Sequence, residues 1–125
     1  MTASEARHDY QMQVAARNQA LFREVNERLE DLNHAFDPLL PRGEFVCECA
    51  NQKCVERIGL SIAEYEAVRE NGAHFCVVAS DEHVYPGVER VVARYEHYWV
   101  VEMIDTAGRL AQNSDPRTRP IHVRT

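Results

Sequence analysis

Apolar side chains in the first third of the chain recur at the spacing of one helix face. Residues 1–12 are polar, and we expect them to be disordered. Between residues 13 and 37, apolar positions return every three, four or seven residues, which predicts a long N-terminal helix. Asp37-Pro38 should end it, because a residue that precedes proline avoids helical backbone angles. The members of this apolar stripe are Val14, Leu21, Val25, Leu29, Leu32 and Phe36.

The apolar stripe has two interpretations. A helix with one apolar face normally packs that face onto the rest of its own domain. The near-heptad spacing, sustained over about three heptads, also permits a protruding helix that pairs with a partner helix or with a second copy of the chain. We favour packing onto the sheet that follows, and keep self-association through the N-terminal helix as the second interpretation.

Shorter patterns, some helical and some β-type, follow the first helix. Ser61 and Glu64 have the spacing of a capping box, which predicts a helix over residues 62–71 that ends at Gly72. Segment 88–95 fits both helical and alternating spacing, and we favour a helix for it. Runs that predict strands occupy residues 44–48, 55–60, 74–79 and 98–104.

Together these elements predict an α+β fold in a chain of 125 residues, a length typical of one domain. We expect residues 44–105 to form a zinc-bound α+β domain, with a small antiparallel sheet and one or two packed helices. Residues 106–125 are polar and contain Pro116 and Pro120, which predicts an irregular tail.

Three cysteines lie within eight residues, where the predicted strand 44–48 ends and before the predicted strand 55–60 begins. Cys47 and Cys49 are two positions apart, so an extended backbone directs both side chains to the same face. The polar run 50–53 suits a turn that would bring Cys54 back over them. Three thiolates so placed repel one another unless a cation lies between them, and Zn²⁺ is the usual cation. The spacing therefore predicts a metal knuckle.

Two residues are candidates for the fourth ligand. Cys76 lies in a predicted strand, where a buried thiol behaves as a small apolar side chain. His83 lies in a polar loop, from which it could turn toward the knuckle; we favour His83 and leave Cys76 open. A zinc ion held by Cys47, Cys49, Cys54 and His83 keeps no coordination position for water, so we expect a structural rather than a catalytic ion.

Charge and composition narrow the possible partners. The net charge of −6 argues against broad binding to DNA or to anionic membranes, and no apolar run reaches the roughly 18–20 residues of a membrane span. The first residues lack the apolar centre of a signal peptide, so we expect a cytoplasmic protein. In a reducing cytosol, clustered cysteines favour metal binding over disulfides.

Catalytic motifs do not stand out in the chain. There is no Gly-rich phosphate loop, no Gly-x-Ser-x-Gly and no His-Glu-x-x-His. We therefore expect a non-enzymatic, zinc-stabilised binding or regulatory module that acts through protein–protein contacts, with a partner the residues do not identify. One alternative is a nucleic-acid-associated, transcriptional regulator that uses Arg117, Arg119 and Arg124. A second is a thiol- or metal-dependent enzyme built on Cys76 with His74 or His83.

The cysteine block resembles a family of small, mostly uncharacterised bacterial proteins. Its members carry Phe-x-Cys-x-Cys, a third Cys and a Leu-Ser/Thr-x-x-Glu-Tyr-Glu-x-Val-Arg helix, which residues 45–49, 54–58 and 60–69 resemble. In that family a Pro-Gly-His-Glu segment follows the third strand, so the resemblance implies His83 as the fourth ligand. Here Ser80-Asp81-Glu82 precedes that histidine instead of Pro-Gly. The resemblance implies no established activity.

Overall fold

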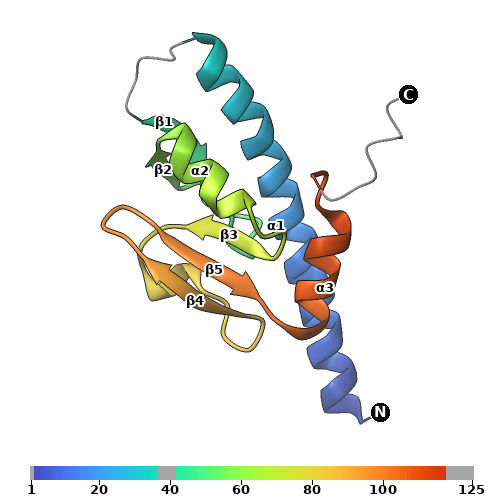
Figure 1. The fold of residues 1–125 in the computed structure, drawn as a ribbon. Helices are drawn as coiled ribbons and strands as arrows, with labels where there is room; N and C mark the ends of the chain where they lie inside the picture. The colour runs from blue at the N-terminus through green and yellow to red at the C-terminus, as the bar shows by residue number, and fades with distance from the viewer. Residues whose placement is uncertain (1, 37–41, 118–125) are drawn as a thin grey trace, which may run out of the picture.

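The computed structural model describes residues 2–36 and 42–117, which form the predicted α+β fold. The first helix runs along one side of the molecule, and the last helix lies beside its N-terminal half (Figure 1). In chain order the elements are α1 (Ala3–Phe36), β1 (Gly43–Val46), β2 (Arg57–Leu60), α2 (Ile62–Arg69), β3 (His74–Val77), the 3-10 helix η1 (Asp81–His83), β4 (Glu89–Arg94), β5 (Trp99–Met103) and α3 (Asp105–Ser114).

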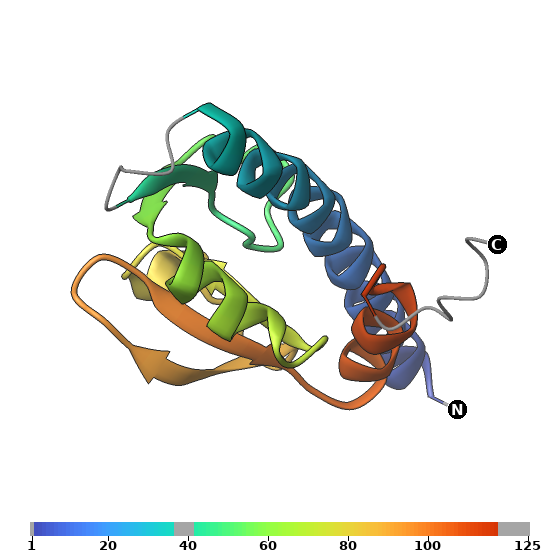
Figure 2. The same cartoon turned by 45° about the horizontal axis from the view of Figure 1, so that its top comes forward.

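The strands form two antiparallel sheets. β1 pairs with β2, and β5 lies between β3 and β4 in a three-stranded sheet. Helix α2 lies between the β1–β2 hairpin and the larger sheet (Figure 2). Its N-terminus has the predicted capping box, in which the Ser61 hydroxyl accepts from the Glu64 amide and the Glu64 carboxylate accepts from the Ser61 amide.

Two apolar clusters hold these layers together. One joins Met12 and Ala16 of α1 to Phe75 and Val101 of the larger sheet, and it includes the sulfur-bearing side chains of Cys47 and Cys49. The other joins the hairpin to α2 and the sheet, with the rings of Phe45 and Tyr65 stacked at 4.6 Å between centroids. The cysteine loop is thus part of the core and not an appendage.

The prediction of a disordered N-terminus is wrong, because α1 begins at Ala3. Thr2 and Glu5 form a second capping box: the Glu5 amide donates to Thr2 Oγ1 at 3.1 Å, and the Thr2 amide donates to Glu5 Oε1 at 3.4 Å. The signal Thr-x-x-Glu was present, but a run poor in large apolar residues concealed it. The predicted stop at Asp37-Pro38 lies outside the described residues.

Two further predictions differ from the structure. Segment 88–95, for which we favoured a helix, contains strand β4, because its alternating positions pair with β5 across a register shift between Val91 and Ala93. Residues 106–114 of the predicted irregular tail belong to α3, which buries Ala107 and Ala111 in the first apolar cluster beside α1. Its polar composition hid a small-residue face that permits close packing. Residues 118–125 of that tail lie outside the described chain.

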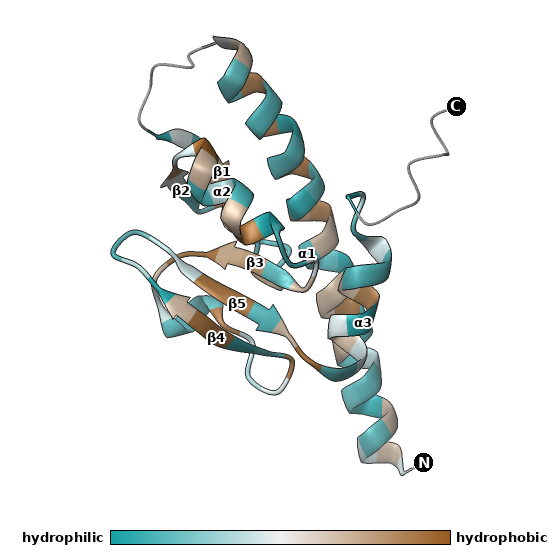
Figure 3. Cartoon of the chain, viewed as in Figure 1, coloured by the Kyte–Doolittle hydropathy of each residue, from teal (hydrophilic) through white to brown (hydrophobic). Residues whose placement is uncertain are grey.

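The orientation of α1 is the reverse of the one we favoured. Leu21, Val25 and Leu32 of the apolar stripe are exposed and do not pack onto the sheet, whereas Leu29 is half-buried against the second apolar cluster. Figure 3 shows α1 alternating between hydrophilic and apolar segments along its length. The side chains that α1 buries are mostly small or polar: Met12, Ala15, Ala16, Gln19, Arg23, Asn26 and Glu30.

These buried polar side chains have a common task, which is to pair with backbone groups of loops and strand edges. Gln19 Nε2 donates to the Glu48 carbonyl at 2.9 Å, and Arg23 donates to the carbonyls of Gly72 at 2.6 Å and Ala111 at 2.9 Å. Asn26 accepts from the Val46 amide and donates to the Val46 carbonyl, both at 2.8 Å, and so covers the free edge of β1. Buried backbone groups without partners would be costly, which explains the polar face of α1.

Replacing Asn26 should show how much its hydrogen bonds to the Val46 backbone contribute to stability. Asn26→Leu keeps the side-chain volume but leaves the Val46 amide and carbonyl unpaired, and we expect the free energy of unfolding to fall by about 2–3 kcal/mol. Chemical denaturation measures the change. Asn33→Leu is the matched control, since Asn33 makes a 3.4 Å exposed hydrogen bond to the Glu44 carbonyl and should cost less than about 1 kcal/mol. Equal losses in the two variants would contradict this account of α1.

Candidate metal centre

The first part of the site is the loop that connects β1 to β2. Cys47 and Cys49 continue β1 in an extended path, and the Cys47 amide donates to the Glu56 carbonyl at 3.0 Å to close the loop. Asn51 shapes the turn: its carbonyl accepts from the Cys54 amide and its side chain accepts from the Lys53 amide, both at 3.0 Å. The turn brings Cys54 back over the other two cysteines, as the spacing predicted.

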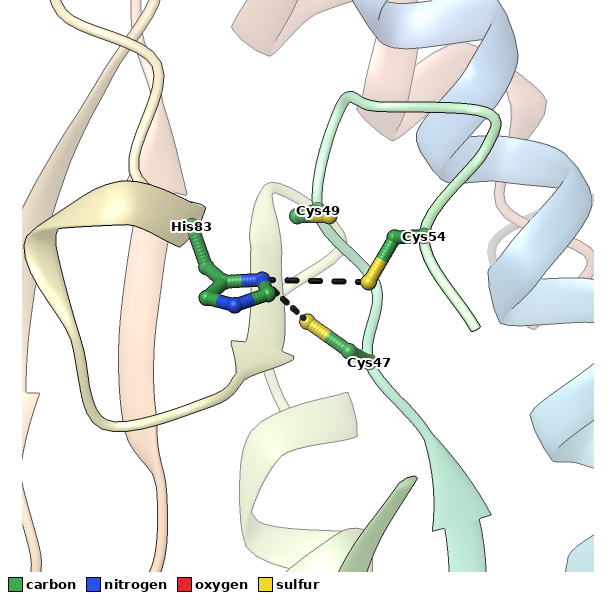
Figure 4. A group of neighbouring side chains, drawn as sticks. All are labelled: Cys47, Cys49, Cys54 and His83. Atoms are coloured by element: carbon green, nitrogen blue, oxygen red, sulfur yellow. Dashed lines mark hydrogen bonds between the residues drawn. The ribbon is translucent and has the colours of Figure 1, made fainter. Parts of the chain in front are cut away.

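The second part is η1, some thirty residues later in the chain. Ser80 caps this short helix, since its hydroxyl accepts from the Glu82 amide at 3.3 Å and its carbonyl accepts from the His83 amide at 3.1 Å. The cap turns the imidazole of His83 toward the cysteine loop. Figure 4 shows the ring directed at the sulfurs of Cys47 and Cys54.

The four predicted side chains lie together. The ligand atoms of Cys47, Cys49, Cys54 and His83 are all within 4.8 Å of one another, and this group could hold a metal ion. His83 Nδ1 is 3.6 Å from Cys47 Sγ and 3.7 Å from Cys54 Sγ. A tetrahedral zinc site has bonds of about 2.3 Å to sulfur and 2.0–2.1 Å to nitrogen, so its ligand atoms lie about 3.5–3.8 Å apart. The two nitrogen–sulfur separations fit such an ion.

Cys76, the other candidate for fourth ligand, is outside this group. It lies in β3 and is fully buried, and Asn26 Nδ2 is 4.0 Å from its sulfur. Burial raises the pKa of its thiol well above the ordinary value, helped by the nearby Glu48 carboxylate. All four cysteines are free thiols. Cys76 therefore has the role of a small core side chain.

The three clustered thiols cannot all ionise easily without a cation. The Cys47 thiol donates a hydrogen bond to Cys49, which lowers the pKa of Cys49 to about 5. The same hydrogen bond, together with burial, raises the pKa of Cys47, and burial also raises that of Cys54. One thiolate can thus form readily, while a second and a third need a positive charge between them. This is the electrostatic setting of a metal site.

Backbone contacts around the sulfurs hold them in place. The Val78 amide lies 3.3 Å from Cys47 Sγ and donates to it, which orients the sulfur and would stabilise it as a thiolate. Glu48, between Cys47 and Cys49, points the opposite way into the core, as the alternation of an extended chain requires. Its carboxylate accepts from the Cys76 amide at 3.0 Å and from Asn26 Nδ2 at 2.8 Å.

The sequence did not reveal these supporting residues. A buried glutamate is rarely predictable from one chain, because charged side chains are normally exposed. The alternation Cys-Glu-Cys was the available signal: if both sulfurs face the ion, the residue between them must face the interior. Asn26 and Glu48 together fasten the cysteine loop to α1 and β3, so the site and the core share one polar network.

Comparison with known proteins gives no further information about this site. None of the helices within the described part of the chain is long and apolar enough to cross a membrane. The likeness of the cysteine block to a bacterial family stays a prediction. No family model, curated protein or solved structure matches the chain.

Proposed function

We propose that this protein is a non-enzymatic, zinc-stabilised binding module that acts through protein–protein contacts in a regulatory setting. The observation that carries the proposal is the convergence of three sulfurs and one imidazole, from two distant segments, within 4.8 Å. Thiolate and imidazole ligands favour zinc over magnesium or calcium, which prefer oxygen.

The ligand set favours a structural ion over a catalytic one. Four protein ligands complete a tetrahedron, whereas a catalytic zinc keeps one position for water. The sulfurs of Cys47 and Cys49 belong to buried residues within the first apolar cluster, which limits access by a substrate. An ion here would tie the β1–β2 loop to η1 and so stabilise a small domain.

The thiol-enzyme alternative has weak support. A nucleophilic cysteine needs an accessible thiol with a lowered pKa. Cys76 has no exposed surface and its pKa is raised, while His74 pairs with Glu102 at 3.0 Å. Neither residue is arranged for nucleophilic chemistry.

The nucleic-acid alternative is also weakly supported. Within the described part of the tail, Arg117 is held by three carboxylates: Glu27 at 2.7 Å, Glu30 at 3.0 Å and Glu66 at 2.7 Å. A guanidinium so paired would have to give up these contacts before it could bind phosphate. We therefore favour protein–protein contacts over nucleic-acid binding, and the exposed apolar side chains described below support this choice.

Metal content in single variants tests the proposal. We expect one zinc per wild-type chain. After equilibration with a competing chelator, Cys54→Ser and His83→Ala should each contain less than about a tenth of the zinc of the wild type, because each variant loses a ligand. Cys76→Ala is the matched control and should keep its zinc, since Cys76 lies outside the group. Elemental analysis by mass spectrometry gives the stoichiometry. Zinc loss in Cys76→Ala with retention in His83→Ala would contradict the ligand set.

A further inference from the structure

The outer face of α1 carries an unusual share of the exposed apolar surface. Among the described residues, seven large hydrophobic side chains are exposed, and four of them lie on this helix: Tyr10 (66%), Leu21 (57%), Val25 (44%) and Leu32 (48%). At 100° per residue these four lie within about 60° of one another around the helix axis. They point away from the buried face that contains Gln19, Arg23 and Asn26. Aligned exposed apolar side chains of this kind mark interaction surfaces.

The spacing along the outer face is that of a coiled-coil seam. Val14 and Leu21 are seven residues apart, as are Val25 and Leu32, and the step from Leu21 to Val25 is four. These intervals place Val14 and Leu21 at d positions, and Val25 and Leu32 at a positions, of one heptad register. Asn18 and Arg28 fill the remaining a and d positions between them. From Tyr10 to Leu32 the seam is about 33 Å long, which suits a helix of similar length as its partner.

We propose that the outer face of α1 pairs with the same face of a second copy of this chain, with the two helices antiparallel. This inference rests on the proposed protein-contact role and deepens it by naming the partner. In the antiparallel register, Leu21 packs against Val25 of the second copy, and Val14 packs against its Leu32. Each contact occurs twice about a twofold axis near residue 23.

The polar positions of the seam select this orientation. In the antiparallel register Arg28 faces the Asn18 position of the second copy, where Asn18 is half-buried and donates to the Ala50 carbonyl of its own chain at 2.9 Å, so no like charge opposes Arg28. A parallel pair would place Arg28 against Arg28 within the seam, and juxtaposed like charges are costly. The antiparallel register avoids this repulsion.

Charges beside the seam point to a second copy as the occupant. Arg17 and Asp31 are exposed on the same flank of α1 and have opposite signs. In the antiparallel register Arg17 lies beside Asp31 of the second copy, and the twofold axis repeats the pair. Glu24 meets its own counterpart on the axis, where Arg28, four residues further along the same helix, can compensate. The face is therefore complementary to itself.

Sedimentation equilibrium of the full metal-loaded chain, over a range of concentrations, tests the inference. We expect a dimer, and we expect Leu21→Glu/Val25→Glu to raise its dissociation constant at least about a hundredfold, since each substitution occurs twice at the centre of the seam. Val92→Glu is the matched control: Val92 is 42% exposed, close to the 44% of Val25, but lies on β4, and its substitution should leave the dimer intact. Circular dichroism verifies that the variants remain folded.

Exchanging the charges of Arg17 and Asp31 tests the antiparallel orientation of the two helices. Both residues are exposed, so the fold should tolerate their substitution. Arg17→Asp should weaken the dimer about tenfold, and Arg17→Asp/Asp31→Arg should restore it, because only the antiparallel register brings these residues together. A monomer at every concentration, a dimer insensitive to Leu21→Glu/Val25→Glu, or failure of the double reversal to recover affinity would overturn the inference. A monomer that still binds one zinc would leave the proposed metal-stabilised role standing, because zinc content is measured separately.

Discussion

Removal of the metal is expected to unfold the cysteine loop and with it most of the domain. Structural zinc contributes about 10–16 kcal/mol of apparent binding free energy in small domains, which equals or exceeds most of the range of about 5–15 kcal/mol of net stability that a typical domain has. Here the loop is also part of the core, since Cys47, Cys49 and Ala50 contact the first apolar cluster. Without an ion, three thiols and an imidazole would be crowded together with only weak hydrogen bonds in place of metal–ligand bonds.

Hydrogen exchange with and without a zinc chelator measures this effect. We expect the amides of Cys47, Glu48 and Val78 to lose protection first. The Cys47 amide donates to the Glu56 carbonyl, the Glu48 amide to a carbonyl of β3, and the Val78 amide to the sulfur of Cys47, so all three bonds depend on the position of the cysteine loop. Added zinc should restore protection, and Cys76→Ala should respond as the wild type does. An unfolding curve that stays unchanged after complete removal of zinc would contradict a stabilising role for the ion.

The second large effect is expected at the buried ion pair between Arg69 and Asp115. Both side chains are almost completely buried, and the Asp115 carboxylate accepts from both terminal nitrogens of Arg69, from Nη1 at 3.3 Å. Asp115→Asn removes the nearest carboxylate charge from the buried Arg69 and leaves Glu27, 3.5 Å away, as its ion-pair partner among the described residues. We expect the free energy of unfolding to fall by about 3 kcal/mol, the low end of the range for such losses.

The effect of Asp115→Asn should also depend on pH. Burial alone would raise the pKa of Asp115, but the hydrogen bonds from Arg69 and from the Arg117 amide outweigh it and lower the pKa below 3.8. A carboxyl with a lowered pKa in the folded state contributes stability above its unfolded pKa and loses it as the pH falls through the folded pKa. The difference between wild type and variant should therefore be full at pH 7 and shrink below about pH 4.

Denaturant titrations at several pH values measure that difference. Asp9→Asn is the matched control, because Asp9 is only half-buried on α1 and accepts an exposed 3.3 Å hydrogen bond from Gln13, so its substitution should cost a few tenths of a kcal/mol at most. Equal stability of Asp115→Asn and Asp9→Asn at pH 7 would show that the Arg69 pair contributes nothing.

Local signals in the sequence predicted part of this fold well. The capping box at Ser61 and Glu64, the β-rich runs and the Cys-x-Cys-x4-Cys spacing each depend on residues a few positions apart, and the structure has a counterpart to each. His83 could be preferred over Cys76 on the same local grounds, since a loop residue turns more freely than one in a strand. The four residues of the candidate metal group could thus be predicted from the sequence.

Features that depend on contacts between residues far apart in the chain could not be predicted in this way. The buried face of α1 consists of Gln19, Arg23 and Asn26, which are core residues only because loop carbonyls and a strand edge lie opposite them. The helix α3 is short and polar, and it is held by its small residues against α1. In both cases tertiary contacts reverse what hydropathy alone indicates, so the apolar stripe was assigned to the wrong face.

X-ray absorption spectroscopy at the zinc edge tests the central claim most directly. The proposed site predicts one zinc ion with three sulfur neighbours at about 2.3 Å and one nitrogen neighbour at about 2.0–2.1 Å. Oxygen neighbours in place of a sulfur, four sulfurs with no nitrogen, or a purified protein that binds no zinc would contradict it.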